Sequence, residues 1–164
     1  MAGKFHTFNI KNIKGLVFQI ALPLLVGALS AFLSGDQKAV YGVLTLPPYA
    51  PPGWLFGVVW PVLYVLMGIS AYLVQKTDFY DAGKKRAFLF YYLQLGVNFF
   101  WSIFFFKFQM YAFSFWWLVL LLALVIATAV LFYDRSRAAG WLMLPYVAWL
   151  SYAAYLSYMV WMLN

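Results

Sequence analysis

Residues 51–75 read PPGWLFGVVWPVLYVLMGISAYLVQ and contain no Lys, Arg, Asp, Glu or His. From Trp54 onward the run is long enough to cross the hydrocarbon core of a bilayer, which takes roughly 20 predominantly apolar residues in a helix. The prolines at its start restrict the chain to extended geometry. Pro61 lies inside the run and removes a backbone hydrogen bond, so we expect a kink there. The stretch therefore predicts a membrane-spanning helix that follows a stiff, extended segment.

Four further uncharged runs of similar length occupy most of the remaining chain. They are continuous, whereas a strand of a transmembrane β-barrel is an alternating segment of about 10 residues. The whole chain is 66% hydrophobic and 9% charged, whereas soluble domains are about 45–50% apolar and about 25% charged. We therefore expect an all-α integral membrane protein, a bundle of five transmembrane helices at about 15–34, 54–75, 87–106, 112–133 and 141–163.

The predicted spans form one membrane domain, residues 15–164, which follows a basic tail, residues 1–14. The first run can be mistaken for a signal peptide, because Lys4, Lys11 and Lys14 precede it. Its uninterrupted apolar core is longer than the apolar region of about 7–15 residues that is typical of signal peptides. An uncleaved first span is therefore favoured over a signal peptide.

The positions of Lys and Arg predict the orientation of the spans, because cytoplasmic loops of membrane proteins carry an excess of both residues. Nine of the eleven lie in the tail, the second loop and the fourth loop, and the other two, Lys38 and Lys107, lie on the opposite side. The N-terminus is therefore expected in the cytoplasm and the C-terminus outside. This topology and contact with anionic lipids account for the net charge of +7, so no nucleic-acid partner is expected.

Few residues in the chain can support conventional catalysis or metal binding. There is no cysteine, and the single histidine, His6, lies in the tail. All four acidic residues lie in predicted loops, which argues against an ion-coupled transport cycle and against ordinary acid–base catalysis. The sequence therefore predicts no metal site and no required cofactor.

Three predicted helices carry aromatic and weakly polar faces at overlapping depths. In the third span, Gln94, Asn98 and Trp101 share a face by their spacing. Because an amide without a partner in hydrocarbon costs several kcal/mol, the two amides must face protein, a water-filled pocket or a ligand. The corresponding faces of the second and fifth spans carry Trp60, Tyr64 and Gly68, and Tyr146, Trp149 and Ala153.

Two interpretations of these faces remain open. Amides and small residues at four-residue spacing, such as Gly27 with Ala31, also let membrane helices pack closely. We favour a pocket for the set as a whole, because bulky aromatic residues with a few polar groups are typical of ligand sites. Such a lining suits a flat apolar ligand, which aromatic rings bind by stacking or edge-to-face contact.

The first loop, residues 35–53, is long and is expected to be an ordered lid over this pocket. Loops longer than about 12–15 residues are usually functional or disordered. Here four prolines leave the chain few conformations to lose, and Tyr41 is among the apolar residues that the loop can lay on the bundle.

The motifs PPGWLFGVVWPVLYVLMGIS, QLGVNFFW and PYVAWLSYAAYLSYMVWMLN, in this order, resemble the translocator protein or tryptophan-rich sensory protein family, TspO/MBR. The resemblance runs from the first span to Asn164. No Lys or Arg follows Arg137, and in this respect the sequence is more similar to bacterial members of the family than to animal members. The resemblance implies a five-helix bundle in the bacterial cell membrane, commonly a homodimer, that binds porphyrins such as protoporphyrin IX and aromatic drug-like molecules beneath the first loop.

The resemblance assigns the site to Trp60, Asn98, Trp101, Trp149 and Ala153, with Tyr41 and Pro51 or Pro52 from the loop. With two residues from the helix faces added, the expected ligand-binding residues are Tyr41, Pro51, Pro52, Trp60, Tyr64, Gln94, Asn98, Trp101, Trp149 and Ala153.

Two classes of function follow from the resemblance and remain open. The first is a membrane protein that binds or senses tetrapyrroles and contributes to their transport or regulation. The second is an enzyme-like degradation of bound protoporphyrin IX in light and oxygen, in which Trp60 and Trp149 would be the catalytic residues.

Overall fold

The computed structural model describes residues 10–77 and 81–164, and in this part of the chain every regular element is helical. Residues 1–9 of the predicted tail, with His6, lie outside the described residues. The elements are α1 (Ile10–Leu33), α2 (Gln37–Val43), α3 (Gly53–Gln75), α4 (Ala82–Ser102), the short π-helix η1 (Ile103–Lys107), α5 (Tyr111–Arg135) and α6 (Arg137–Leu163).

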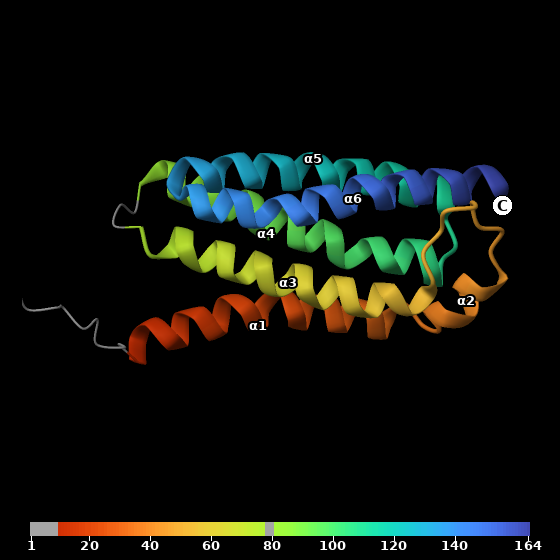
Figure 1. The fold of residues 1–164 in the computed structure, drawn as a ribbon, viewed down its shortest axis with the longest axis horizontal. Helices are drawn as coiled ribbons and strands as arrows, with labels where there is room; N and C mark the ends of the chain where they lie inside the picture. The colour runs from red at the N-terminus through yellow and green to blue at the C-terminus, as the bar shows by residue number, and fades with distance from the viewer. Residues whose placement is uncertain (1–9, 78–80) are drawn as a thin grey trace, which may run out of the picture.

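The five long helices run side by side and reverse direction from one to the next (Figure 1). α1 packs against α3 and α4, whereas α5 packs against α4 and α6, and α3 also contacts α6. The end of α6 lies at the same end of the bundle as α2 and the segment between α2 and α3 (Figure 1). The predicted lid therefore lies across one end of the bundle, beside the last turn of α6.

Four of the helical segments are long and apolar enough to cross a membrane: Ile13–Leu33, Gly53–Gln75, Ala82–Lys107 and Tyr111–Arg135. The third of these joins α4 and η1 into one continuous segment. α6 contains the fifth predicted span but is not one of the four, because its many Tyr and Trp residues lower its mean hydropathy. The chain is an integral multi-pass membrane protein, and the fifth crossing stays a prediction.

Side-chain caps set where several helices begin. Asp36 precedes α2, Asp81 precedes α4 and Ser136 precedes α6, and each accepts a hydrogen bond from an amide of the first turn. The amide of Lys84 donates to Asp81 at 2.9 Å, and α4 accordingly begins at Ala82 rather than at 87. Apolar content alone placed this start too late, because the helix continues through its charged first turn.

The sequence does not predict α2, which lies inside the segment 35–53. A helix of two turns is too short for its apolar period to be read, and it is marginal without packing. Tyr41 of α2 is half-buried, and its ring contacts Phe56 of α3 edge-on at a centroid distance of 5.4 Å. This contact attaches α2 to the bundle.

Glycines bring α1 and α3 into close contact. A Cβ at Gly68 would lie 2.5 Å from the carbonyl oxygen of Gln19 and 2.5 Å from the Cα of Ile20. Tyr64 lies directly against Gly27, where any added Cβ would overlap its ring. These small residues let the two backbones approach, as is common in membrane helix pairs. Gly68, which the spacing places on the aromatic face of the second span, therefore serves the contact with α1.

The end of the bundle opposite the lid is held by polar contacts. The Nζ of Lys84 donates to the carbonyls of Gln75 at 2.7 Å and of Thr77 at 2.8 Å, which ties the start of α4 to the end of α3. Asp81 pairs with Arg135 at 2.8 Å. The hydrogen bond from the amide of Lys84, and then the one from Arg135, hold the pKa of Asp81 below its usual value.

The described basic residues are distributed unevenly between the two ends of the bundle. Lys38 and Lys107 lie at the lid end, and the larger group lies at the opposite end, where α1 begins: Lys11, Lys14, Lys76, Lys84, Lys85, Arg86, Arg135 and Arg137.

The close approach of α1 to α3 at Gly68 predicts that a larger residue at this position lowers the stability of the protein. Gly68→Ala should lower the melting temperature of the detergent-solubilised protein, because the new Cβ meets backbone atoms that cannot move alone, a strain of about 1–3 kcal/mol. Gly57→Ala is the matched control, since Gly57 lies in the same helix with nothing within 4 Å of an added Cβ. The control should be neutral or stabilising by up to about 1 kcal/mol. Equal melting temperatures for the two variants would contradict the packing described here.

Candidate functional site

The lid, residues 35–53, is fixed by side chains that bond to its backbone. The hydroxyl of Tyr41 donates to the carbonyl of Pro51 at 2.7 Å, within the lid itself. Burial, and then the nearby Tyr152, raise the pKa of Tyr41, so its hydroxyl keeps the proton that it donates. Tyr152 of α6 donates from its own hydroxyl to the carbonyl of Tyr49 at 2.6 Å.

The side-chain amide of Asn164 makes a second connection between the lid and the end of α6. Its Nδ2 donates to the carbonyl of Thr45 at 3.0 Å, and its Oδ1 accepts from the amide of Thr45 at 3.0 Å. The Nδ2 also donates to the carbonyl of Val160, one turn back in α6. The lid is therefore joined to α6 at two points, although 119 residues separate Thr45 from Asn164.

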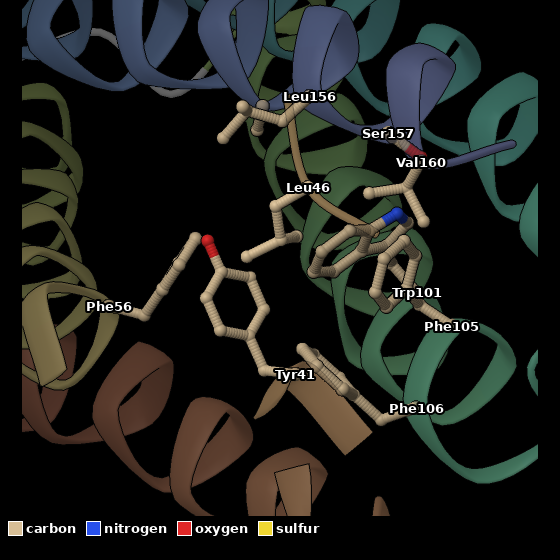
Figure 2. Close-up of a pocket in the computed structure, with 10 residues that line it drawn as sticks. Tyr41, Leu46, Phe56, Trp101, Phe105, Phe106, Leu156, Ser157 and Val160 are labelled. Atoms are coloured by element: carbon tan, nitrogen blue, oxygen red, sulfur yellow. The ribbon is translucent and has the colours of Figure 1, made fainter. Parts of the chain in front are cut away.

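A small cavity lies beneath the lid, with a volume of about 30 Å³. Its walls come from α2 and the lid, from the first turn of α3, from the end of α4 with η1, and from the last turns of α6 (Figure 2). The surface is almost entirely apolar. The lining residues are Tyr41, Leu46, Phe56, Trp101, Phe105, Phe106, Ala153, Leu156, Ser157 and Val160.

Three of the residues predicted from the sequence line this cavity: Tyr41, Trp101 and Ala153. The predicted loop prolines do not. Pro51 is buried and contributes its carbonyl to Tyr41, whereas Pro52 is exposed.

Trp60, Tyr64, Trp101 and Tyr146 form an aromatic cluster next to the cavity. The ring centroid of Trp60 lies 5.6 Å from that of Tyr64, 6.5 Å from that of Trp101 and 6.2 Å from that of Tyr146. These separations fit tilted and edge-to-face ring contacts. Trp101 belongs to both groups, because it also lines the cavity and stacks on Phe105 at 5.2 Å. The cluster and the cavity are therefore contiguous through one indole.

The two amides of the third predicted span face protein partners. The Nδ2 of Asn98 donates to the hydroxyl of Tyr146 at 2.7 Å, and that hydroxyl donates to the Oε1 of Gln94 at 3.3 Å. The Nε2 of Gln94 in turn contacts the sulfur of Met67 at 3.2 Å. All four side chains are buried. The sequence allows these amides to face protein, a water-filled pocket or a ligand, and in the structure they face protein.

The ring of Trp149 contacts residues outside the aromatic cluster. Its centroid lies 5.7 Å from that of Phe56 and 5.8 Å from that of Tyr152. It does not line the cavity, and its buried Nε1 has no hydrogen-bond partner among the described residues. Because Phe56 also contacts Tyr41 and Tyr152 also holds Tyr49, Trp149 packs beside the attachments of the lid.

Several residues of this region were not predicted from the sequence. Phe56 precedes Trp60 by four positions and Ser157 follows Ala153 by four, so the same helical spacing was a usable signal for both. Tyr146 was placed on a face but not in the predicted site. Asn164 carried no local signal, because its partner is in the lid.

The chemistry that this arrangement offers is apolar binding with a few hydrogen-bond donors. Among the described residues there is no group of three or more His, Cys, Asp or Glu side chains that can hold a metal ion. The cavity lining adds only a phenol, an indole and a hydroxyl to its apolar walls.

Comparisons with known proteins identify chains that are similar in sequence. A model of the TspO/MBR family matches residues 19–162. The tryptophan-rich protein TspO of Archaeoglobus fulgidus is 35% identical over 154 residues, which cover 93% of this chain and 99% of that protein. Protein CrtK of Rhodobacter capsulatus is 38% identical over 138 residues, which cover 84% of this chain and 85% of that protein. The human translocator protein is 34% identical over 148 residues, which cover 90% of this chain and 86% of that protein. The similarity therefore extends over most of the helical region.

If the hydrogen bonds of Asn164 hold the lid closed, their removal should make a residue beneath the lid more accessible. The chain has no cysteine, so Ala153→Cys provides a single thiol beneath the lid. Adding Asn164→Ala should raise the rate of its modification by a small thiol reagent roughly twofold to tenfold, because a hydrogen bond contributes a net 0.5–1.5 kcal/mol or so.

The control for this labelling is Tyr49→Cys, a position that is 78% exposed on the lid. Its thiol should react at the same rate with and without Asn164→Ala. An unchanged rate at position 153 would show that Asn164 does not hold the lid.

Proposed function

This chain belongs to the TspO/MBR family, and on that premise we propose that it binds tetrapyrroles such as protoporphyrin IX, and similar flat apolar ligands, beneath the lid. In this role it is a membrane-embedded binding or sensing protein that contributes to tetrapyrrole transport or regulation. The observation that carries the proposal is the cavity under the lid, together with the aromatic cluster that adjoins it.

The ligand site comprises the predicted residues that surround this region. Trp60, Tyr64 and Trp101 offer ring faces and edges to a macrocycle. Asn98 and Gln94 hold Tyr146 in place beside Trp60 and thereby fix the wall that the ligand meets. The list of proposed ligand-binding residues remains Tyr41, Pro51, Pro52, Trp60, Tyr64, Gln94, Asn98, Trp101, Trp149 and Ala153.

Binding requires the lid to move. Pockets for small molecules have volumes of about 300–1,000 Å³, whereas this cavity has about 30 Å³. The side chains that close it from above are Tyr41, Leu46 and Phe56, and two of these belong to the lid. Their displacement enlarges the cavity beside Trp149, which contacts Phe56, and beside the aromatic cluster, which shares Trp101 with the cavity.

We assign the chain five spans, with the N-terminus in the cytoplasm and the C-terminus outside, in the bacterial cell membrane. Two features support this topology: α6 is 27 residues long with its one charged residue at its start, and most described basic residues lie at the end where α1 begins. Both agree with a fifth crossing and with the excess of Lys and Arg on the cytoplasmic side. The homodimer is proposed on the family resemblance alone.

The binding proposal predicts that replacing the indole of Trp60 weakens the affinity for protoporphyrin IX. Protoporphyrin IX added to the purified protein should quench tryptophan fluorescence and shift the porphyrin absorbance, with saturation. Trp60→Phe should weaken the affinity by roughly three- to tenfold, because aromatic contacts contribute about 0.5–1.5 kcal/mol each. Asn98→Ala should also weaken it, because Tyr146 loses a partner.

Trp116→Phe is the matched control, since Trp116 is 63% exposed on α5 and lines no part of the site. The absorbance shift provides a readout that does not depend on the number of tryptophans. Unchanged affinity in both site variants would rule out this site, and the absence of saturable binding to the wild type would rule out the function.

The alternative function is light- and oxygen-dependent degradation of bound protoporphyrin IX. The ring contacts of Trp60 favour it, because an indole that an excited porphyrin has oxidised would lie against Trp101 and Tyr146, which are themselves oxidisable. Under illumination in air, porphyrin absorbance should then fall faster in the complex than with albumin or detergent alone. Trp60→Phe or Trp149→Phe should abolish the excess rate, whereas Trp116→Phe should not. Equal or slower loss in the complex would favour simple binding.

A further inference from the structure

The start of α1 meets the end of α3 at the end of the bundle opposite the lid (Figure 1). A Cβ added at Gly15 would lie 3.5 Å from the ring of Tyr72 and 3.8 Å from the Oε1 of Gln75. The Nζ of Lys76 lies 5.4 Å from the centre of the same Tyr72 ring. Lys14 directly precedes Gly15, and both lysines are exposed. These five residues form one surface, which we call the α1–α3 junction.

The lysines of the junction have no acidic partner in the described part of the chain. The single ion pair found there joins Arg135 to Asp81. Neither Lys14 nor Lys76 makes an ion pair or a side-chain hydrogen bond with a described residue. Within the described residues, the junction therefore presents two ammonium groups without a counter-charge.

The end of α3 would ordinarily repel an anion, because the last carbonyls of a helix carry a partial negative charge. Here the Nζ of Lys84 donates to the carbonyls of Gln75 and Thr77, at 2.7 and 2.8 Å. Lys84 is buried. Its ammonium group therefore offsets the partial negative charge and brings a third positive charge next to the junction.

Gln75 supplies a hydrogen-bond donor at the same place. Its Oε1 accepts from the Nε2 of Gln19 at 3.1 Å. This bond orients the side chain and leaves both hydrogens of the Gln75 Nε2 without a partner among the described residues. Because Gln75 is exposed, these hydrogens are accessible to a molecule outside the bundle. Charged ammonium groups with a neighbouring amide donor suit the oxygens of a phosphate group.

The depth of the junction favours a lipid over a dissolved anion. α3 has 23 residues and is about 35 Å long at 1.5 Å per residue, whereas the hydrocarbon core of a bilayer is about 30 Å thick. Its last residues therefore lie near the lipid headgroups. Val17 and Phe18 follow the junction along α1, within its apolar span, and both are exposed. They offer a surface to acyl chains, which a dissolved anion lacks.

We propose that the α1–α3 junction binds the phosphate group of one anionic phospholipid, with Lys14 and Lys76 as charged partners and the Nε2 of Gln75 as a donor. The site lies at the end of the bundle opposite the lid and goes beyond the proposed function. It also differs from the general attraction between basic loops and anionic membranes, because it depends on the position of the lysines and not on the total charge.

Native mass spectrometry of the detergent-solubilised protein tests the site with two lipids that have the same acyl chains. These are phosphatidylglycerol and phosphatidylcholine, in which the choline cation offsets the phosphate charge. The wild type should retain one phosphatidylglycerol more tightly than phosphatidylcholine. Lys14→Gln and Lys76→Gln should each weaken phosphatidylglycerol binding about fivefold and leave phosphatidylcholine binding unchanged. Lys14→Arg with Lys76→Arg keeps both charges and should keep the preference.

The matched control is Arg86→Gln with Arg137→Gln, since both arginines are exposed at the same end of the bundle and lie outside the junction. It removes as much charge as Lys14→Gln with Lys76→Gln and should keep the preference. Equal retention of the two lipids by the wild type, or equal losses in the two double variants, would overturn the proposal. So would displacement of phosphatidylglycerol by inorganic phosphate beyond the effect of chloride at the same ionic strength, because the site would then bind dissolved anions.

Discussion

Hydrogen bonding in an apolar solvent is the constraint on which this structure depends. Inside a bilayer no water competes for backbone or side-chain polar groups, so each group must find a partner within the protein. The backbone meets the requirement by forming helices. Buried side chains meet it through long-range contacts, such as the chain from Asn98 through Tyr146 to Gln94 and the two carbonyls held by Lys84. In the described residues, six buried side-chain atoms have no such partner.

The same constraint explains the form of the lid. Its prolines lack amide hydrogens and fix the backbone, so the segment stays ordered with few backbone bonds. The carbonyls and amides that remain are bonded by side chains: Tyr41 serves Pro51, Tyr152 serves Tyr49 and Asn164 serves Thr45. Because most of these contacts lie at an exposed end of the bundle, water can replace them at a net cost of about 0.5–1.5 kcal/mol for each hydrogen bond.

The sequence predicted the helical membrane fold well, because the absence of charge over about 20 residues is a local property that can be read directly. Helical spacing also grouped Gln94 with Asn98 and Trp60 with Tyr64 correctly on shared faces. Spacing does not say which neighbour a face meets: Gly68 and Tyr64 share the face of Trp60, and both also contact α1. It could not predict the pairing of Thr45 with Asn164, since contacts between distant segments leave no trace in local periodicity.

α6 connects the lid to the cavity. Ala153 and Ser157 of this helix form one wall of the cavity, and Tyr152 and Asn164 of the same helix hold the lid. In the proposed binding mode, a ligand displaces Tyr41 and Leu46 and then rests against the wall of the cavity that α6 forms. Lid opening and ligand contact therefore draw on one set of side chains. In this binding mode the strength of the lid contacts affects the apparent affinity, because only molecules with an open lid bind the ligand. The apparent affinity is the intrinsic affinity multiplied by the fraction of molecules whose lid is open.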